Sequence, residues 1–329
     1  MSKYILITGG GGFIGHHLVQ SFDVDQKILV LDNFLRGSPE RLKECGENVE
    51  ILNCDITDQQ SLRDVTNDFD IRCIYHLAAI NGTGNFYKMP IQIMDIGVLG
   101  CFNILQLAKE KNVSKCIVAS SAEVYQNPDI IPTSEDVTLK IPSYTNPRYS
   151  YALSKIYTEY YSYHFSKQNK INTSIFRPHN VYGPDMGLQH VIPQFIMQFL
   201  EQNEEKSVNI NTKGPLDSQR AFAYVSDIVD GIRLLEEAPD NVDVFNIGTN
   251  EMITIKDILQ KISEIESCSF DFDSEDQHLG STPKRCPDIT KISTLGYSPK
   301  VDFDTGLKLT YSWYKQNYNH LKDITNKIF

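Results

Sequence analysis

The chain has 329 residues, with 31 basic and 42 acidic side chains and a net charge of −11, which argues against nucleic acid or an anionic membrane as a partner. No stretch approaches 18 consecutive apolar residues and no signal-peptide pattern opens the chain, so we expect neither a membrane span nor secretion. Seven scattered cysteines without a CxxC pair predict reduced thiols in a cytoplasmic protein and no metal site.

The first half alternates short apolar runs with helical patterns, which is typical of a parallel sheet covered on both faces. Helices are expected near Gly15–Phe22, Gln59–Asn67 and Met94–Lys111. The pattern predicts a doubly wound α/β domain over residues 1–180. Its six expected strands are Tyr4–Ile7, Lys27–Leu31, Val49–Leu52, Asp70–His76, Lys115–Ala119 and Thr173–Arg177.

The second half, residues 181–329, is predicted to form a smaller and mostly helical lobe, with chain crossings that leave the boundary approximate. Helices are expected near Val191–Asn203, Ser226–Glu237 and Thr254–Ser263, with short strands at Val208–Ile210 and Val244–Ile247. The acidic run Asp271–Asp276 is expected to be a solvated loop.

A glycine-rich turn follows the first strand directly and opens a helix. Its glycines Gly9, Gly12 and Gly15 suit a tight turn, close approach to a pyrophosphate, and close packing of the helix on the strand. Backbone amides and the positive helix end would hold the phosphates. The turn therefore predicts a dinucleotide site.

Acidic residues after the next two strands refine that site. Asp32 ends the second strand, 20 residues after Gly12, where a carboxylate can accept both ribose hydroxyls of an adenosine. Its charge would repel a 2′-phosphate, so NAD is favoured over NADP, although Arg36 lies close enough to oppose that preference. Asp55 and Ile56 follow the third strand and are expected to flank the adenine, with a capping role for Asp55 as the alternative.

Tyr151 and Lys155 stand four residues apart, and therefore on one face of a helix. A tyrosine is a poor base at neutral pH, because its ordinary pKa is near 10. A neighbouring ammonium and an oxidised nicotinamide both favour the phenolate and lower that pKa. The pair is thus a candidate base for removing the proton from a sugar hydroxyl as hydride leaves its carbon.

Together these segments resemble the extended short-chain dehydrogenases/reductases, specifically the NAD-dependent nucleotide-sugar epimerase/dehydratase family. The resemblance runs almost end to end, and its fold is a Rossmann domain with a substrate lobe. The segments that carry it are Thr8–Gly15, Asp32, His76–Ala79, Ser120–Tyr125, Tyr151–Lys155, Arg177–Pro184, Arg220–Asp227, Phe245–Gly248 and Arg285–Asp288.

The resemblance implies a role for each matching residue. Tyr151 would be the base, Lys155 its partner and a ligand of the nicotinamide ribose, and Ser121 a hydrogen-bonding partner of the reacting hydroxyl. The implied substrate is a nucleotide-diphosphate sugar. The residues expected to contact it are Asn81, Ser121, Asn180, Arg220 and Arg285. The residues expected to hold NAD are Gly9, Gly12, Phe13, Ile14, Gly15, Asp32, Asn33, Asp55, Ile56, Leu77, Ala78, Ala79, Lys155 and Pro178.

Departures from the family pattern bear on the reaction. The 4,6-dehydratases carry an aspartate acid where Ala122 stands, and simple 4-epimerases usually carry an uncharged residue where Glu123 stands. The chain therefore keeps a carboxylate beside C5 and C6 of the sugar and lacks the acid that expels the C6 hydroxyl. Gly97 stands where family members often carry asparagine. Asn81–Asn85 resembles the substrate loop of GDP-mannose 3,5-epimerases in part.

We expect an NAD-dependent epimerase that transiently oxidises C4 and inverts C4, or inverts C5 with Glu123 as the base. The alternative is a 4,6-dehydratase or decarboxylase that uses the same ketone. A net dehydrogenase or ketoreductase and a non-catalytic NAD-binding regulator are further rivals, and intact Tyr151 and Lys155 argue against the regulator. The family often dimerises through two helices, here Met94–Lys111 and Tyr149–Lys167, so a homodimer is expected.

Overall fold

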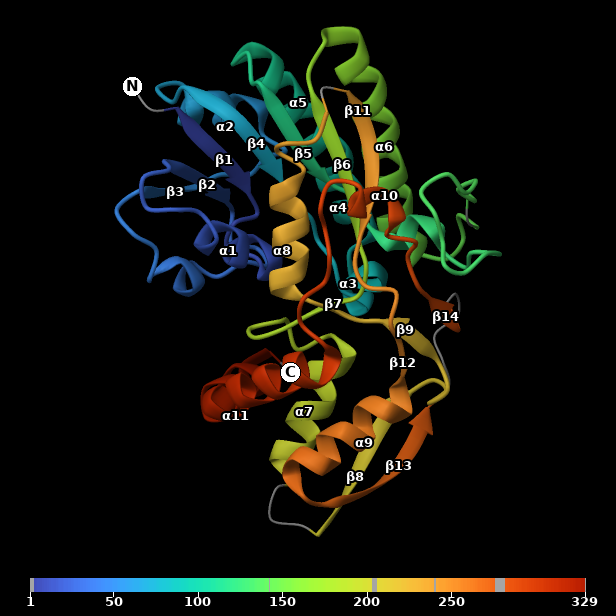
Figure 1. Cartoon of the computed structure of the whole chain (residues 1–329). Helices are drawn as coiled ribbons and strands as arrows, with labels where there is room; N and C mark the ends of the chain where they lie inside the picture. Colours follow the sequence, from blue (N-terminus) through green and yellow to red (C-terminus); the bar gives the residue numbers. More distant parts are fainter. Residues whose placement is uncertain (1–2, 142, 203–205, 240, 276–281, 329) are drawn as a thin grey trace.

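A parallel sheet of seven strands forms the larger lobe of the computed structural model (Figure 1). The structure describes residues 3–141, 143–202, 206–239, 241–275 and 282–328. The six strands expected in the first half are present, and the doubly wound α/β fold is confirmed. The strands, in their order across the sheet, are β11 (Val242–Ile247), β6 (Thr173–Pro178), β5 (Lys115–Ala119), β4 (Ile71–His76), β1 (Tyr4–Thr8), β2 (Ile28–Asp32) and β3 (Val49–Asn53).

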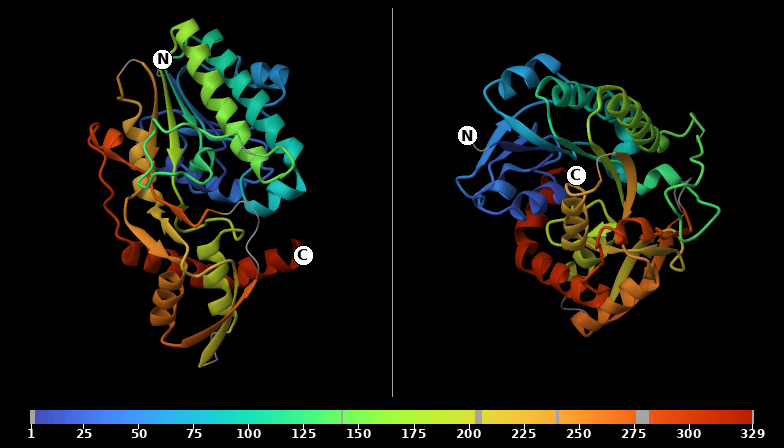
Figure 2. Two further views of the ribbon diagram at one scale, coloured as in Figure 1. Left: turned by 90° about the vertical axis from the view of Figure 1, so that its right-hand side faces the viewer. Right: turned by 45° about the horizontal axis from the view of Figure 1, so that its top comes forward.

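Helices cover both faces of this sheet, which explains the near-continuous apolar strands (Figure 2). On one face, Leu62, Leu105 and Tyr151 share a buried cluster with sheet residues. On the other, Leu18 and Ile228 do the same. The first face carries α2 (Gln59–Thr66), α4 (Pro90–Asp95), α5 (Cys101–Glu110) and α6 (Tyr149–Asn169), and the second carries α1 (Phe13–Gln20) and α8 (Val225–Leu234).

A π-helical turn, Ile96–Gly100, joins α4 to α5. A Cβ at Gly97 would lie 2.7 Å from the Ser154 side chain, and the Gly97 carbonyl accepts a hydrogen bond from Thr158, so α6 packs too closely here for any larger residue. The joined run Pro90–Glu110 is long and apolar enough to cross a membrane by length and composition alone, and 56% of its apolar window is buried inside the protein.

The seventh strand corrects one expectation. Val244–Ile247, expected in the second lobe, belongs to β11, which pairs in parallel with β6 from Val242↔Thr173 to Ile247↔Pro178. Helix α8 returns with it and packs on α1. The reason is burial, since β11 completes the edge of the main sheet with Phe245 and Ile247 in its core.

The second lobe packs three helices on short strands around an aromatic core that includes Phe199, Phe303 and Tyr314. Its helices are α7 (Val191–Glu201), α9 (Ile255–Glu266) and α11 (Phe303–Ile328), and its strands are β8 (Ser207–Lys213), β9 (Gln219–Ala221), β12 (Met252–Thr254), β13 (Ser269–Glu275) and β14 (Lys284–Arg285). Short elements elsewhere are two 3₁₀ turns (Pro39–Leu42 and Ala122–Tyr125), α3 (Thr83–Lys88), β7 (Val181–Tyr182), β10 (Ala223–Tyr224) and α10 (Thr290–Ser293).

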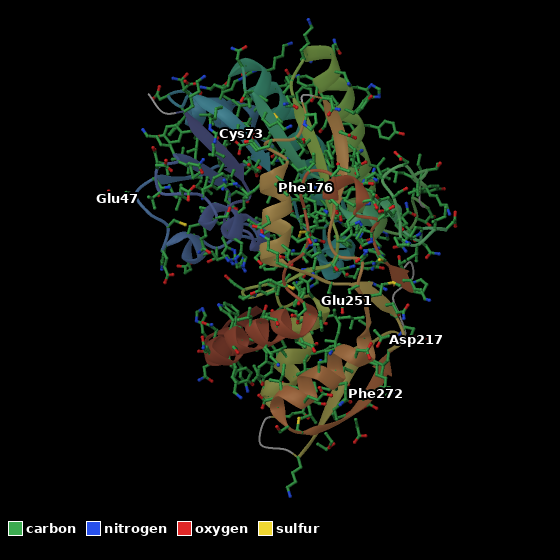
Figure 3. The ribbon with its side chains drawn as sticks, in the orientation of Figure 1. Glu47, Cys73, Phe176, Asp217, Glu251 and Phe272 are labelled. Carbon is green, nitrogen blue, oxygen red and sulfur yellow. The ribbon has the colours of Figure 1, made fainter. Side chains whose placement is uncertain are left out.

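The acidic run is also corrected. Residues 269–275 form β13, which pairs in parallel with β8, because aromatic and acidic residues alternate there with the period of a strand. Phe270 packs toward the lobe core, whereas Phe272, labelled in Figure 3, is 47% exposed. Asp276 lies outside the described residues.

Candidate active site

A cavity of about 1020 Å³ opens at the carboxyl ends of the main strands and extends to the second lobe. The order of the sheet reverses at β1, and ligands of such sheets bind beside this reversal. Every cofactor, substrate and catalytic residue predicted from the sequence lines the cavity. Seven of its lining residues are lysine or arginine and three are carboxylates, so an acidic protein holds a cationic cavity suited to phosphates.

The glycine-rich turn fits a dinucleotide. Gly9 has φ +75°, and a Cβ there would lie 2.8 Å from the Ala78 backbone, so the ends of β1 and β4 can meet only at a glycine. A Cβ at Gly15 would lie 2.1 Å from the Gly9 carbonyl oxygen. The glycine turn, which has no side chains at these positions, and the N-terminus of α1, which begins at Phe13, together form a site that can accept a pyrophosphate.

Asp32 lies at the end of β2, where its side chain is buried. Its carboxylate accepts hydrogen bonds from the backbone N–H groups of Gly11 (2.9 Å) and Phe34 (2.8 Å), so it also shapes the glycine turn. Asp55 accepts from the backbone N–H and the hydroxyl of Thr57, at 2.9 and 2.7 Å, and this contact supports the local capping role. Its place beside the adenine stays a prediction.

Tyr151 and Lys155, the candidate catalytic pair, lie on one face of α6, as their spacing predicts. Burial raises the pKa of Tyr151 well above its ordinary value, and the charge of Glu123 adds to this, whereas a hydrogen bond from Ser121 lowers it. Lys155 donates to the Ala119 carbonyl at 2.7 Å, and burial lowers its pKa to about 8. Residues here fit an oxidised nicotinamide, whose positive charge would oppose the effect of burial on Tyr151.

Glu123 forms an ion pair with Arg285, whose Nη1 donates to Oε1 at 2.6 Å. Arg148 Nη2 lies 3.9 Å from the other carboxylate oxygen. Burial by itself would raise the pKa of Glu123, but the charge and hydrogen bond of Arg285, with the charges of Arg148 and Arg220, hold it below its ordinary value. Glu123 is thus kept as a carboxylate, and its strength as a base is reduced.

Arg220 and Asn180 occupy the same end of the cavity. The Arg220 guanidinium donates to the carbonyls of Gln219 (2.8 Å), Pro283 (3.0 Å) and Thr282, so it is held by backbone rather than by a surface carboxylate. Burial lowers its pKa to about 10, and the like charge of Arg285 contributes. Asn180, at φ +39°, donates to the Ala221 carbonyl at 3.3 Å.

A buried polar network supports the strand ends that carry these groups. Arg177 on β6 donates to both oxygens of Glu159, at 2.7 and 2.6 Å, and to the Tyr125 hydroxyl. Tyr125 in turn donates to Asn246 on β11 at 2.7 Å. Glu159 also accepts from Ser120, the neighbour of the candidate site residue Ser121. This network fixes the Ser120–Tyr125 segment against the sheet.

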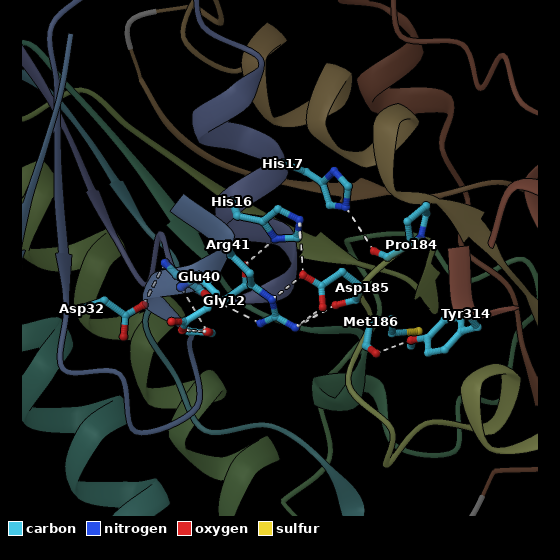
Figure 4. A network of polar contacts seen from close by, with 12 residues as sticks. Gly12, His16, His17, Asp32, Glu40, Arg41, Pro184, Asp185, Met186 and Tyr314 are labelled. Carbon is cyan, nitrogen blue, oxygen red and sulfur yellow. Dashed lines mark hydrogen bonds and ion pairs between the residues drawn. The ribbon is translucent and has the colours of Figure 1, made fainter. Parts of the chain in front are cut away.

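A second network joins the glycine turn to the segment after β7 (Figure 4). Arg41 donates from Nε and Nη2 to the two oxygens of Asp185, at 2.7 and 2.9 Å, and to its carbonyl at 2.7 Å. His17 contacts the Pro184 carbonyl at 3.2 Å, and the Tyr314 hydroxyl donates to the Met186 carbonyl. We call the Arg41–Asp185 ion pair the latch.

The structure adds cavity residues that sequence reasoning missed. Arg41, Arg148, Met186, Gln189 and His190 all line the cavity. None stands in a motif whose spacing signals a function. Asp185 is separated from Arg41 by 144 positions, so only the folded chain brings the two together.

The family model described as NAD dependent epimerase/dehydratase matches residues 5–248 of the chain. Among curated proteins, a Bacillus cytotoxicus UDP-N-acetyl-α-D-glucosaminuronate decarboxylase is 31% identical over 97% of this chain and 100% of its own length.

Two solved structures resemble the fold closely. The Thermotoga maritima UDP-glucose 4-epimerase with UDP-glucose is 27% identical, with a TM-score of 0.87 over 96% of this chain and 99% of its own. The Bacillus cereus UDP-glucuronic acid 4-epimerase with UDP-glucuronic acid and NAD is 28% identical, with a TM-score of 0.84 over 96% of this chain and 100% of its own. The relatives therefore include both decarboxylases and epimerases.

Proposed function

The chain belongs to the NAD-dependent epimerase/dehydratase family, and from this membership we propose that it oxidises C4 of a UDP-linked hexuronate and then removes the C6 carboxylate as carbon dioxide. The glycine turn and Asp32 would hold NAD, which would supply the hydride acceptor for C4 and the hydride that restores the C4 hydroxyl. The observation that carries the proposal is the Glu123–Arg285 ion pair, with Arg148 beside it, in the same cavity as Tyr151.

In the proposed mechanism, Tyr151 and Ser121 act on the O4 hydroxyl. Tyr151, as phenolate, takes the O4 proton while Ser121 donates a hydrogen bond to the same oxygen. The C4 ketone makes the substrate a β-keto acid, so the electron pair of the C5–C6 bond can pass into the carbonyl as carbon dioxide leaves. Tyr151 is protonated at this stage and can donate to the enolate oxygen. Solvent then protonates C5, and Tyr151 returns its proton to O4.

Decarboxylation suits this site better than two of the alternatives do. Ala122 has no acid with which to expel a C6 hydroxyl, which argues against a 4,6-dehydratase. A carboxylate whose pKa is lowered by arginine is a weak base for C5, which argues against C5 epimerisation. Decarboxylation needs no base at C5. The curated relative named above, a decarboxylase of a UDP-linked aminohexuronate, supports the same choice.

C4 epimerisation is the second candidate. It is one of the two outcomes, inversion of C4 or of C5, in the main expectation from the sequence. It is favoured by the likeness to the two 4-epimerase structures, one of them named for UDP-glucuronic acid. Both candidates share C4 oxidation, with bound NAD as the hydride acceptor and Tyr151, beside Lys155, as the base. They differ only in the fate of the ketone.

The test is incubation of the NAD-loaded protein with UDP-glucuronate, UDP-N-acetylglucosaminuronate, UDP-glucose and UDP-galactose, followed by mass spectrometry and NMR. We expect the mass of carbon dioxide to be lost from a hexuronate. An unchanged mass, together with NMR signals that show the inverted configuration at C4, indicates the epimerase instead. Three other outcomes would contradict both candidate functions. Loss of water would indicate a dehydratase, and accumulation of free reduced cofactor would indicate a dehydrogenase. No turnover would indicate a regulator.

A further inference from the structure

Arg148 is the cavity arginine whose guanidinium is uncommitted. It lies at the start of α6, three residues before Tyr151, so both project from one face of the helix. Its side chain is 11% exposed and lines the cavity. The backbone N–H of Arg148 donates to Asn146 Oδ1 at 3.0 Å. Its guanidinium lies 3.9 Å from Glu123 and makes no hydrogen bond to any residue that the structure describes.

The other two arginines at this end of the cavity bind protein acceptors, although Nε of Arg285 is buried without a partner among the described residues. Arg285 donates to Glu123 at 2.6 Å and lies 3.4 Å from the Thr282 hydroxyl. Arg220 donates to three backbone carbonyls. The Arg148 guanidinium instead lines the cavity without a protein hydrogen-bond partner among the described residues, so its donors are open to an acceptor on a ligand.

We propose that Arg148 binds the carboxylate of the sugar and thereby makes the site selective for hexuronates over neutral hexoses. The inference rests on the proposed function, because that function places a hexuronate with its C4 hydroxyl at Tyr151. C6 is two bonds from C4, and Arg148 is one helical turn from Tyr151. A planar guanidinium also matches a carboxylate with two parallel hydrogen bonds.

The arrangement of charges supports this role. A substrate carboxylate beside Glu123 would be repelled, since two carboxylates a few ångströms apart raise each other's energy. Arg148 and Arg285 would then flank the two carboxylates, so each negative group meets a positive one. This neutralisation is specific to a charged sugar, because a neutral hexose leaves Arg148 without an acceptor.

The test compares the affinities of UDP-glucuronate and UDP-glucose for the NAD-loaded protein by calorimetric titration. In the wild type we expect UDP-glucuronate to bind more tightly. Arg148→Gln should weaken UDP-glucuronate roughly 10- to 100-fold, the range for lost charge-assisted hydrogen bonds, and should leave UDP-glucose nearly unchanged. Arg148→Lys should keep part of the preference for UDP-glucuronate, because lysine keeps the positive charge but cannot make two parallel hydrogen bonds to a carboxylate.

Arg63→Gln is the matched control, because it removes a positive charge from an exposed pair with Glu110, and Arg63 does not line the cavity. It should leave the ratio between the two sugars unchanged. A wild-type protein that binds both sugars equally, or an Arg148→Gln variant that weakens both alike or neither, overturns the assignment whatever product forms. If the wild type binds both sugars with the expected preference but turns over neither, the proposed function fails and the role of Arg148 stands.

Discussion

Asp32 shows how one buried side chain serves both the fold and the ligand. Its two oxygens accept backbone N–H groups on either side, from the glycine turn and from the residue after Asn33. Carboxylate oxygens have several lone pairs, so ribose hydroxyls can still donate to them. Burial raises the pKa of Asp32, whereas these hydrogen bonds and the charge of Arg41 lower it.

We predict that Asp32→Asn narrows the preference for NAD over NADP. The amide keeps one acceptor for the glycine turn but loses the charge that repels a 2′-phosphate. NAD affinity should fall about tenfold or more, the size of a lost charge-assisted hydrogen bond, while NADP affinity should fall less or rise. Titration of both dinucleotides into the cofactor-free protein measures this, with Asp129→Asn, an exposed partner of Lys140 that does not line the cavity, as the control. An unchanged ratio would contradict the role of Asp32.

At this scale, prediction from the sequence succeeds where a residue stands in a spaced motif. Tyr151, Lys155 and the glycines lie where their spacing places them, because helix periodicity and turn geometry are local properties. Arg148 and Arg41 could not be found this way. Their roles depend on partners brought near by the fold, and a lone arginine in a sequence resembles any surface arginine.

At the scale of elements, the segment after β7 is bound to the cofactor side of the molecule by the latch. Arg41 follows β2 and Asp185 follows β7, and their side chains are 15% and 28% exposed. Arg41 also lies 3.3 Å from the Gly11 carbonyl, so the latch reaches the glycine turn itself. Met186 and Gly187, next to it, line the cavity.

We predict that opening the latch speeds the loss of NAD. Arg41→Gln and Asp185→Asn should each raise the dissociation rate of NAD about tenfold or more, because a partly buried ion pair holds its two segments together only while both partners remain. The double variant should add little beyond either single one. Stopped-flow transfer of NAD to a scavenging dehydrogenase measures the rate.

The control for the latch is Arg63→Gln, which breaks the exposed ion pair between Arg63 on α2 and Glu110 on α5. Its NAD dissociation rate should equal that of the wild type. Equal rates in the latch variants and the wild type would mean that the ion pair is structural and does not retain the cofactor.

At the scale of the whole molecule, three buried histidines and the half-buried His190 make stability depend on pH. Burial lowers the pKa of His16 and His190 to about 4 and of His76 and His179 to about 3, from an ordinary value of 6.5. Each is therefore neutral in the folded state and takes up a proton more readily when unfolded. Stability should fall as the pH drops from 6.5 towards 3.

Between its folded and unfolded pKa, each such histidine lowers the free energy of unfolding by about 1.4 kcal/mol for each pH unit that the pH falls. Urea unfolding at a series of pH values measures the slope. His76→Gln should reduce the slope by about that amount. A flat profile between pH 6.5 and 4 would show that these histidines titrate normally.

The main sheet was predictable from the sequence because buried parallel strands appear as short apolar runs between helices. The place of β11 was not, since Val242–Ile247 resembles any short strand and its partner β6 lies far back in the chain. Strand pairing over such a distance depends on which sheet edge remains open after the nearer strands have paired.

Because β11 comes late in the chain, the main sheet stays incomplete for part of the synthesis of this protein. The 63 residues between Pro178 and Val242 must be made before β11 can cover the edge of β6. At roughly 5–20 residues per second, this leaves a row of unpaired backbone groups exposed for about 3–13 seconds. During that interval the growing chain can pair with another copy of itself. The open edge of β6 is therefore protected from aggregation only after Ile247, the last residue of β11, has been synthesised.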